Sequence, residues 1–101
     1  MSRRFSGQTA LVTGGAQGIG FGVAEYLGRE GASVVLLDMS ADALAAAVSK
    51  LSAAGVSASA HTVNVTKEED WARAVAAVLT GAGAPGRIDV LVQAAGITGE
   101  Q

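Results

Sequence analysis

Three glycines, Gly14, Gly18 and Gly20, are spaced as Gly-x-x-x-Gly-x-Gly between a short apolar run and a segment of helical periodicity. Glycines between a strand and a helix let the backbone approach a pyrophosphate, which then faces the free N–H groups and the positive dipole end of the helix. No Gly-Lys-Ser/Thr follows, which excludes a Walker-type loop. A turn that serves only chain reversal is the alternative, but the position between strand and helix favours phosphate binding.

Asp38 is a second candidate for ligand binding, because it closes an apolar run about 20 residues beyond the glycine loop, where a ribose-binding acid is expected. A carboxylate accepts hydrogen bonds from both ribose hydroxyls and repels a 2′-phosphate. Residues 30–49 contain no Lys or Arg, and Gln17 in the loop is neutral. The sequence therefore favours NAD over NADP. The alternative role for Asp38 is that of a solvated turn carboxylate or of an acid at the start of a helix.

Strand and helix patterns alternate along the chain. Strands are expected over 8–13, 33–38, 57–63 and 88–92, and helices over 18–31, over 41–54 with Gly55 as the terminating glycine, and from a capping box at Thr66 and Glu69 up to a loop at 81–86. The predicted buried stripes are Ile19, Val23, Tyr26 and Leu27 on the first helix, and Trp71, Val75, Val78, Leu79 and Ala82 on the third. Strands separated by helices predict an α/β fold with a parallel sheet covered by helices.

Four motifs in order resemble those of short-chain dehydrogenases/reductases, and the resemblance runs from about residue 6 to residue 98. The segments that carry it are Thr13-Gly14-x-x-x-Gly18-Ile19-Gly20, Asp38, Asn64-Val65-Thr66, and Asp89-Val90-Leu91-Val92-Gln93-Ala94-Ala95-Gly96. It implies a Rossmann-type doubly wound parallel sheet, here partial, with four strands in the order 3-2-1-4 and three helices. The candidate cofactor-binding residues are Gly14, Gln17, Gly18, Ile19, Gly20, Asp38, Met39, Asn64, Val65, Gln93, Ala94, Ala95 and Gly96.

Two of these segments depart from the family pattern. Asn64 replaces the commoner acid, but its side-chain carbonyl can still accept a hydrogen bond from the adenine amine, and a helix-capping role is compatible with this. Gln93 and Ala94 replace a pair of Asn residues, so the polar contacts that hold this strand end are expected to differ. Ala95 and Gly96 keep the small residues that let the backbone approach the cofactor ribose.

The catalytic residues of the family are not found in these 101 residues. The resemblance implies hydride transfer between NAD(H) and an alcohol or carbonyl, with a Tyr-x-x-x-Lys pair moving the proton. The sole tyrosine, Tyr26, is followed four residues later by Glu30, Lys50 and Lys67 belong to other helices, and His61 stands alone on a strand. We therefore assign no catalytic residue and interpret residues 1–101 as a single, partial dinucleotide-binding domain, the cofactor half of a longer enzyme, inactive by itself.

Composition narrows the remaining function classes. The absence of Cys excludes a disulfide framework and thiolate metal sites, and no metal site is predicted. Seven Lys and Arg against nine Asp and Glu give no basic surface for nucleic acid. No apolar run reaches the roughly 20 residues needed to span a membrane, and no signal peptide is recognised, so a cytoplasmic location is expected. An open fourth strand predicts a homo-oligomer or a partner chain. Two alternatives to the enzyme remain: a non-catalytic dinucleotide-binding module and a self-assembling structural fragment.

Overall fold

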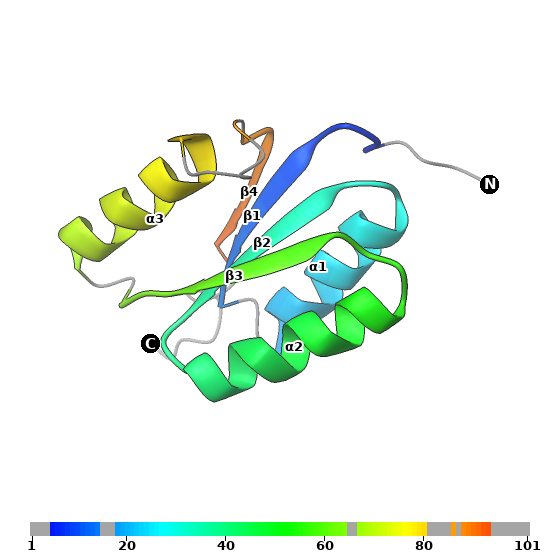
Figure 1. Ribbon diagram of the computed structural model, residues 1–101, viewed down its shortest axis with the longest axis horizontal. Helices are drawn as coiled ribbons and strands as arrows, with labels where there is room; N and C mark the ends of the chain where they lie inside the picture. Colours follow the sequence, from blue (N-terminus) through cyan, green and yellow to red (C-terminus); the bar gives the residue numbers. More distant parts are fainter. Residues whose placement is uncertain (1–4, 15–17, 65–66, 81–85, 87, 94–101) are drawn as a thin grey trace.

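The computed structural model describes residues 5–14, 18–64, 67–80, 86 and 88–93. Its elements follow the order β1 (Thr9–Thr13), α1 (Gly18–Arg29), β2 (Ser33–Asp38), α2 (Ala41–Ala53), β3 (Ala58–Thr62), α3 (Glu68–Thr80) and β4 (Val90–Gln93). All strand pairs are parallel and the strand order is β3-β2-β1-β4 (Figure 1). The predicted α/β fold of Rossmann type, with the order 3-2-1-4 and three helices, is confirmed.

The sheet is covered on both faces, with α1 and α2 on one side and α3 on the other (Figure 1). Successive residues of a strand point to opposite faces, so β1 and β2 divide their apolar side chains between two cores. One core holds Ala10, Val12, Val34 and Leu36 together with residues of α1 and α2. The other holds Leu11, Val35 and Leu37 with Val63 and residues of α3. This explains why the runs at 9–13 and 33–38 are almost continuously apolar.

The predicted buried stripe of α1 is wrong at two positions. The buried residues are Gly20, Ala24 and Leu27, whereas Ile19 is 58% exposed and Tyr26 is 49% exposed. Ile19 and Tyr26 each precede a buried residue by one position, which turns them about 100° away from the sheet. The helix presents its smaller residues to the sheet, and a prediction that favours large apolar residues selects the neighbouring face.

On α3 the prediction fails at Leu79, which is 43% exposed beside the buried Val78. Ala74 completes the buried face, and Trp71 and Val75 pack against the same core. The proposed capping residue Thr66 and the predicted stripe residue Ala82 lie outside the described residues, as does most of the loop at 81–86. The end of α2 agrees with expectation, since Gly55 follows the helix with a φ of 85°.

The last strand, β4, is attached to β1 by hydrogen bonds at both of its ends. At the start, the Asp89 N–H donates to the Thr9 carbonyl and the Thr9 N–H donates to Oδ2 of Asp89, each at 2.8 Å. Near the other end, the Thr13 hydroxyl donates to the Val92 carbonyl at 3.3 Å. These bonds secure β4 although the Asn pair of the family pattern is replaced by Gln93 and Ala94.

We expect Gly28→Ala to lower the free energy of unfolding by about 1–3 kcal/mol, the usual cost of overpacking a core. A Cβ at Gly28 would overlap Cγ1 of Val56, which is itself buried. The matched control is Gly22→Ala in the same helix, where an added Cβ has no neighbour within 4 Å. That change should stabilise the chain by up to about 1 kcal/mol through helix propensity. Urea unfolding of both variants makes the comparison, and a Gly28→Ala chain as stable as Gly22→Ala would contradict it.

Candidate functional site

The ends of the four strands lie at one edge of the sheet, and the predicted site residues Gly14, Asp38 and Gln93 lie at or directly after strand ends there. Thr13 is paired with Leu37 of β2 and with Gln93 of β4, and Asp38 is paired with Thr62 of β3. Because all strands are parallel, their carboxyl ends lie on the same side (Figure 1). This is the edge at which open α/β sheets bind their ligands.

Gly14 leaves β1 in a conformation that favours glycine. Its φ is 66°, and its N–H donates a 2.7 Å hydrogen bond to the carbonyl of Leu37. A left-handed φ costs other residues free energy, whereas glycine adopts it readily. The bond fixes the start of the glycine loop against the residue that precedes Asp38, and Gly15, Ala16 and Gln17 lie outside the described residues.

Gly18 and Gly20 begin α1 with different constraints. Gly18 has a φ of 61° and open space where a Cβ would be, so its backbone conformation rather than its packing requires glycine. Gly20 is buried in the first turn, on the side of the helix that faces the sheet. Ile19, between them, is exposed. The N-terminus of a twelve-residue helix therefore lies at the carboxyl edge, where its N–H groups and dipole favour an anion.

Asp38 is held at the end of β2 by two backbone N–H groups, one bonded to its side chain and the other to its carbonyl. Its Oδ1 accepts the N–H of Met39 at 2.7 Å, and its carbonyl accepts the N–H of Val63 at 2.9 Å. A carboxylate has about four acceptor sites, and Oδ1 uses one of them for the N–H of Met39. Met39 itself is 61% exposed at the same edge.

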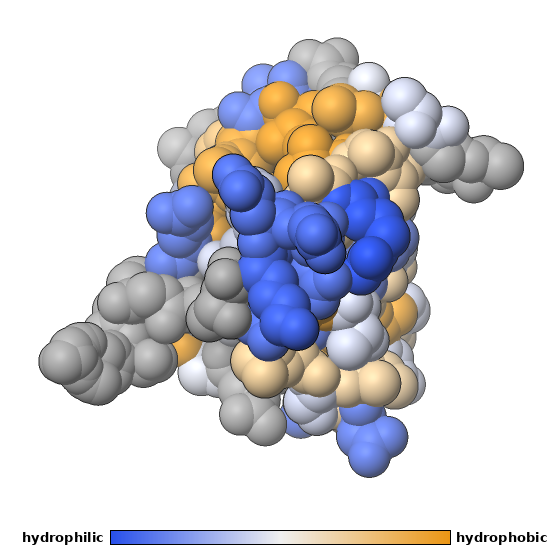
Figure 2. All heavy atoms as spheres, turned by 90° about the vertical axis from the view of Figure 1, so that its left-hand side faces the viewer, coloured by the Kyte–Doolittle hydropathy of each residue, from blue (hydrophilic) through white to orange (hydrophobic). Residues whose placement is uncertain are grey.

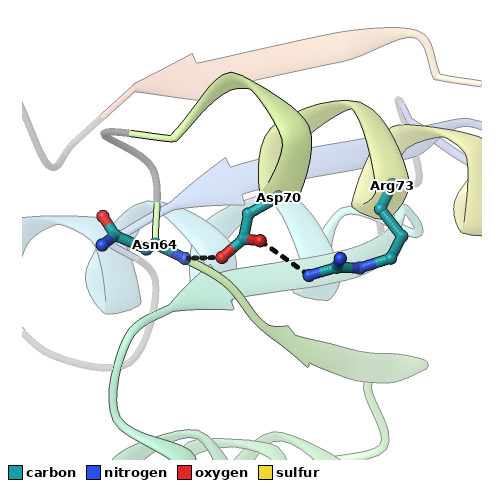
Figure 3. A network of polar contacts seen from close by, with 3 residues as sticks. All are labelled: Asn64, Asp70 and Arg73. Carbon is teal, nitrogen blue, oxygen red and sulfur yellow. Dashed lines mark hydrogen bonds and ion pairs between the residues drawn. The ribbon is translucent and has the colours of Figure 1, made fainter.

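Asn64 follows β3 and is tied to α3 by a carboxylate that the sequence analysis missed. Its N–H donates to Oδ2 of Asp70 at 3.0 Å, and its carbonyl accepts the N–H of Lys67 at 2.9 Å. The second carboxylate oxygen, Oδ1 of Asp70, is 2.7 Å from Nη2 of Arg73 (Figure 3). The sequence did contain a signal, since acids in the first turn of a helix often reach back to backbone N–H groups, but the predicted acid was Glu69.

The hydrogen bond from Asn64 lowers the pKa of Asp70 below its ordinary value of 3.8, and removal from water acts in the opposite direction. Arg73, through a hydrogen bond and its charge, and Lys67, through its charge, lower this pKa further. A pKa that falls on folding adds stability above the unfolded pKa, and this stability is lost as the pH falls through the folded pKa.

Unfolding experiments on the wild type and Asp70→Asn over a pH series should reveal this titration. The wild type should be more stable than the variant at neutral pH. This advantage should shrink as the pH falls below the ordinary pKa of 3.8, because only the wild type has a carboxylate at position 70 to protonate. An advantage that stays constant as the pH falls to about 2 would contradict the assignment.

The other predicted residues are placed as follows. Gln93 is exposed at the end of β4, and the predicted site residues outside the described part of the chain are Gln17, Val65, Ala94, Ala95 and Gly96. Tyr26 lies on α1, and Nζ of Lys50 on α2 lies 5.8 Å from the ring centroid of Phe21. Across residues 5–14, 18–64, 67–80, 86 and 88–93, no group of three His, Asp or Glu side chains could hold a metal ion.

Comparison with known proteins decides the family. The sequence model of short chain dehydrogenases matches residues 8–101. The chain belongs to this family. A relative from Bacillus subtilis, the uncharacterized oxidoreductase YxjF, is 46% identical over 90 residues, which cover 89% of this chain and 34% of the relative. The 2-dehydro-3-deoxy-L-rhamnonate dehydrogenase (NAD(+)) of a Sphingomonas species is 42% identical over 96 residues, or 95% of this chain and 36% of the relative.

A solved structure supports the same assignment of the short-chain dehydrogenase fold. A metagenomic short-chain oxidoreductase in complex with NADP superimposes with a TM-score of 0.79 and 39% identity, covering 86% of this chain and 38% of that one. The chain thus spans about a third of the length of the curated relatives that it matches. None of the helices in the described parts of this chain has the length and apolar character needed to cross a membrane.

Proposed function

We propose that this chain is the cofactor-binding part of an NAD-dependent oxidoreductase that transfers hydride between NAD(H) and an alcohol or carbonyl group. One observation carries the proposal: the glycine turn and the acid are joined at the carboxyl edge of the sheet. The Gly14 N–H is bonded to Leu37, the residue before Asp38, and the Asp38 carbonyl is bonded to Val63, the residue before Asn64. A phosphate cradle, a ribose acceptor and an adenine acceptor thereby follow one another along the edge.

The residues present fit a dinucleotide, and each has a distinct task. The N-terminus of α1, opened by Gly14 and Gly18, holds the pyrophosphate through its N–H groups. Asp38 accepts hydrogen bonds from the adenosine ribose, and Asn64 accepts one from the adenine amine. Gln17, Ile19, Met39 and Val65, together with Gln93, Ala94, Ala95 and Gly96, complete the proposed contacts. The bound nicotinamide supplies the hydride chemistry.

Asp38 supports the choice of NAD within this proposal. A 2′-phosphate on the ribose would lie against its carboxylate, and like charges at hydrogen-bonding distance repel. Residues 30–49 offer no Lys or Arg to neutralise such a phosphate. The NADP complex of the metagenomic oxidoreductase is a property of that protein, and the residues of this chain favour the cofactor without the phosphate.

The proton transfer of the reaction requires groups that residues 1–101 do not provide in the family's pattern. Tyr26 is half-exposed on α1 and is followed at the fourth position by Glu30 rather than by a lysine. Hydride transfer to a carbonyl needs a positioned proton donor near its working pKa. In this proposal the 101-residue chain is one partial dinucleotide-binding domain that binds NAD without turning over a small alcohol or carbonyl substrate.

Calorimetric titration of the chain with NAD and with NADP tests the proposed function. We expect saturable heat with NAD and weaker binding of NADP, without oxidation of an added alcohol. Absence of heat with millimolar NAD would refute cofactor binding and favour the structural alternative. Tighter binding of NADP than of NAD would refute the cofactor choice while leaving dinucleotide binding intact.

We also propose that the outer edge of β4 joins a second copy or a partner chain. β4 pairs with β1 and, within the described residues, with no other strand. Leu91 is 50% exposed and Leu79 is 43% exposed. Figure 2 shows hydrophobic residues gathered at the upper end of one face, above a hydrophilic region. Sedimentation velocity should detect association of the isolated chain, and a stable monomer at high concentration would contradict it.

A further inference from the structure

The backbone of Asn64 is fixed on both of its polar groups, and one of the two partners is a side chain of α3. The N–H donates to Oδ2 of Asp70 (Figure 3). The carbonyl accepts the N–H of Lys67. Asp70 belongs to the first turn of α3, so its carboxylate spans from the helix to the residue that follows the end of β3 by two positions. The direction in which the Asn64 side chain leaves the backbone is therefore set partly by Asp70.

Both ends of this span are themselves anchored to the sheet. Val63 is 4% exposed, and its N–H is bonded to the carbonyl of Asp38. On the helix, Ala74 and Val78 are 3% and 1% exposed and share a core with Val63. Because the strand end and the helix are both anchored in this core, the hydrogen bond between them fixes the backbone of Asn64 relative to α3.

The second oxygen of Asp70 contributes less than the first. Arg73 lies 2.7 Å from Oδ1, but its side chain is 69% exposed. Exposed ion pairs contribute little, whereas a hydrogen bond from a backbone N–H to a carboxylate is charge-assisted and directional. The bond to Asn64 is thus the one that has a structural consequence for the site.

We propose that Asp70 is a positioning residue for the adenine end of the cofactor, acting through the backbone of Asn64. It holds Asn64 so that the side-chain carbonyl faces the adenine amine beside the ribose bound by Asp38. This inference rests on the proposed function and deepens it. It assigns part of the cofactor affinity to a side chain that does not touch the cofactor.

The test is a mutational cycle read out as the dissociation constant for NAD, measured by calorimetry on the 101-residue chain. Asp70→Ala should raise this constant about tenfold, which corresponds to about 1.4 kcal/mol. Asp70→Asn keeps an acceptor oxygen of the same shape and should stay within about threefold of wild type. The matched control Arg73→Ala removes the ion pair but leaves the bond to Asn64, and should change the constant less than about twofold.

Repeating Asp70→Ala in a chain that already carries Asn64→Ala distinguishes positioning of Asn64 from a purely structural role of Asp70. There the acceptor for adenine is already absent, so adding Asp70→Ala should have less than about a twofold further effect on NAD binding. Circular dichroism at the titration temperature verifies that each variant is folded. If Asp70→Ala is unfolded, Asp70→Asn is compared with the wild type instead.

Each contrary result has a distinct meaning. An unchanged dissociation constant in Asp70→Ala, or an equal tenfold rise in the Asn64→Ala background, would overturn the positioning role while NAD binding by the wild type upheld the proposed function. Unfolding of both Asp70 variants would also overturn it, because Asp70 would then support the whole fold rather than the site. A wild type that binds no NAD would overturn both proposals.

Discussion

Replacing Asp38 with alanine is expected to raise the dissociation constant for NAD by about 10- to 100-fold, because hydrogen bonds to a charged group contribute about 1.5–3 kcal/mol. The carboxylate ends β2, with its own carbonyl bonded to Val63 and Oδ1 bonded to the N–H of Met39. These bonds hold Asp38 at the carboxyl edge of the sheet. The ribose hydroxyls would lose both of their acceptors in the variant.

The same change should improve NADP binding, since the negative charge that opposes the 2′-phosphate is removed. The two effects together should reverse or abolish the preference for NAD. Asp42→Ala is the matched control, because Asp42 is an exposed acid in the first turn of α2 and its loss changes the net charge equally. Calorimetric titration of both variants with NAD and with NADP measures these dissociation constants. Equal effects of the two variants would show that general charge rather than a ribose contact sets the affinity.

Leu36→Ala is expected to lower the free energy of unfolding by about 2–5 kcal/mol, the range for a large buried side chain truncated in a core. Leu36 is 0% exposed at the centre of β2, between its register partners Val12 of β1 and Ala60 of β3. Its side chain lies in the core shared with α1 and α2, where no solvent can fill the space that it leaves. Because whole domains are stable by only about 5–15 kcal/mol, this loss is a large fraction of the total.

The control for this prediction is the same substitution at Leu91, which is 50% exposed on β4. Leu91→Ala removes the same atoms from a half-solvated position and should cost less than about 1 kcal/mol. Urea unfolding followed by circular dichroism gives both values under one set of conditions. Equal destabilisation by the two variants would mean that the core around Leu36 does not carry the stability of the sheet.

The parts of the fold that could be predicted from sequence are those written in local patterns. The continuous apolar run of β2, the terminating Gly55 and the position of Asp38 at a strand end all depend on residues within a few positions of one another. The strand order came from the family resemblance, and hydrogen bonding of the sheet confirms it. Gly14 and Asp38 could be expected at one edge of the sheet for the same reason, since parallel strands align their ends, and their role in cofactor binding stays a prediction.

The errors and omissions arise where the partner lies far along the chain. The prediction of the buried face of α1 was wrong because the small residues Gly20 and Ala24 pack closely against the sheet. Helical periodicity by itself does not say which of two adjacent stripes lies nearer to the sheet. The hydrogen bonds of the Asp89 and Asp70 side chains were missed because their partners are the backbone N–H groups of Thr9 and Asn64, and a sequence pattern does not identify backbone donors.

The bond between Thr9 and Asp89 joins residues that are 80 positions apart, and this separation affects how the chain is made as well as how it is held. β1 can pair with β2 once a single intervening helix has been synthesised, but it can pair with its other neighbour, β4, only after β4 has been made. At roughly 5–20 residues per second, the roughly 50 residues between β2 and β4 take about 3–10 s to synthesise. During that interval one row of backbone donors and acceptors on β1 has no strand beside it, and such an edge can pair with other chains. β1, whose five residues are all buried in the finished fold, therefore passes through a stage of synthesis in which one of its edges is open.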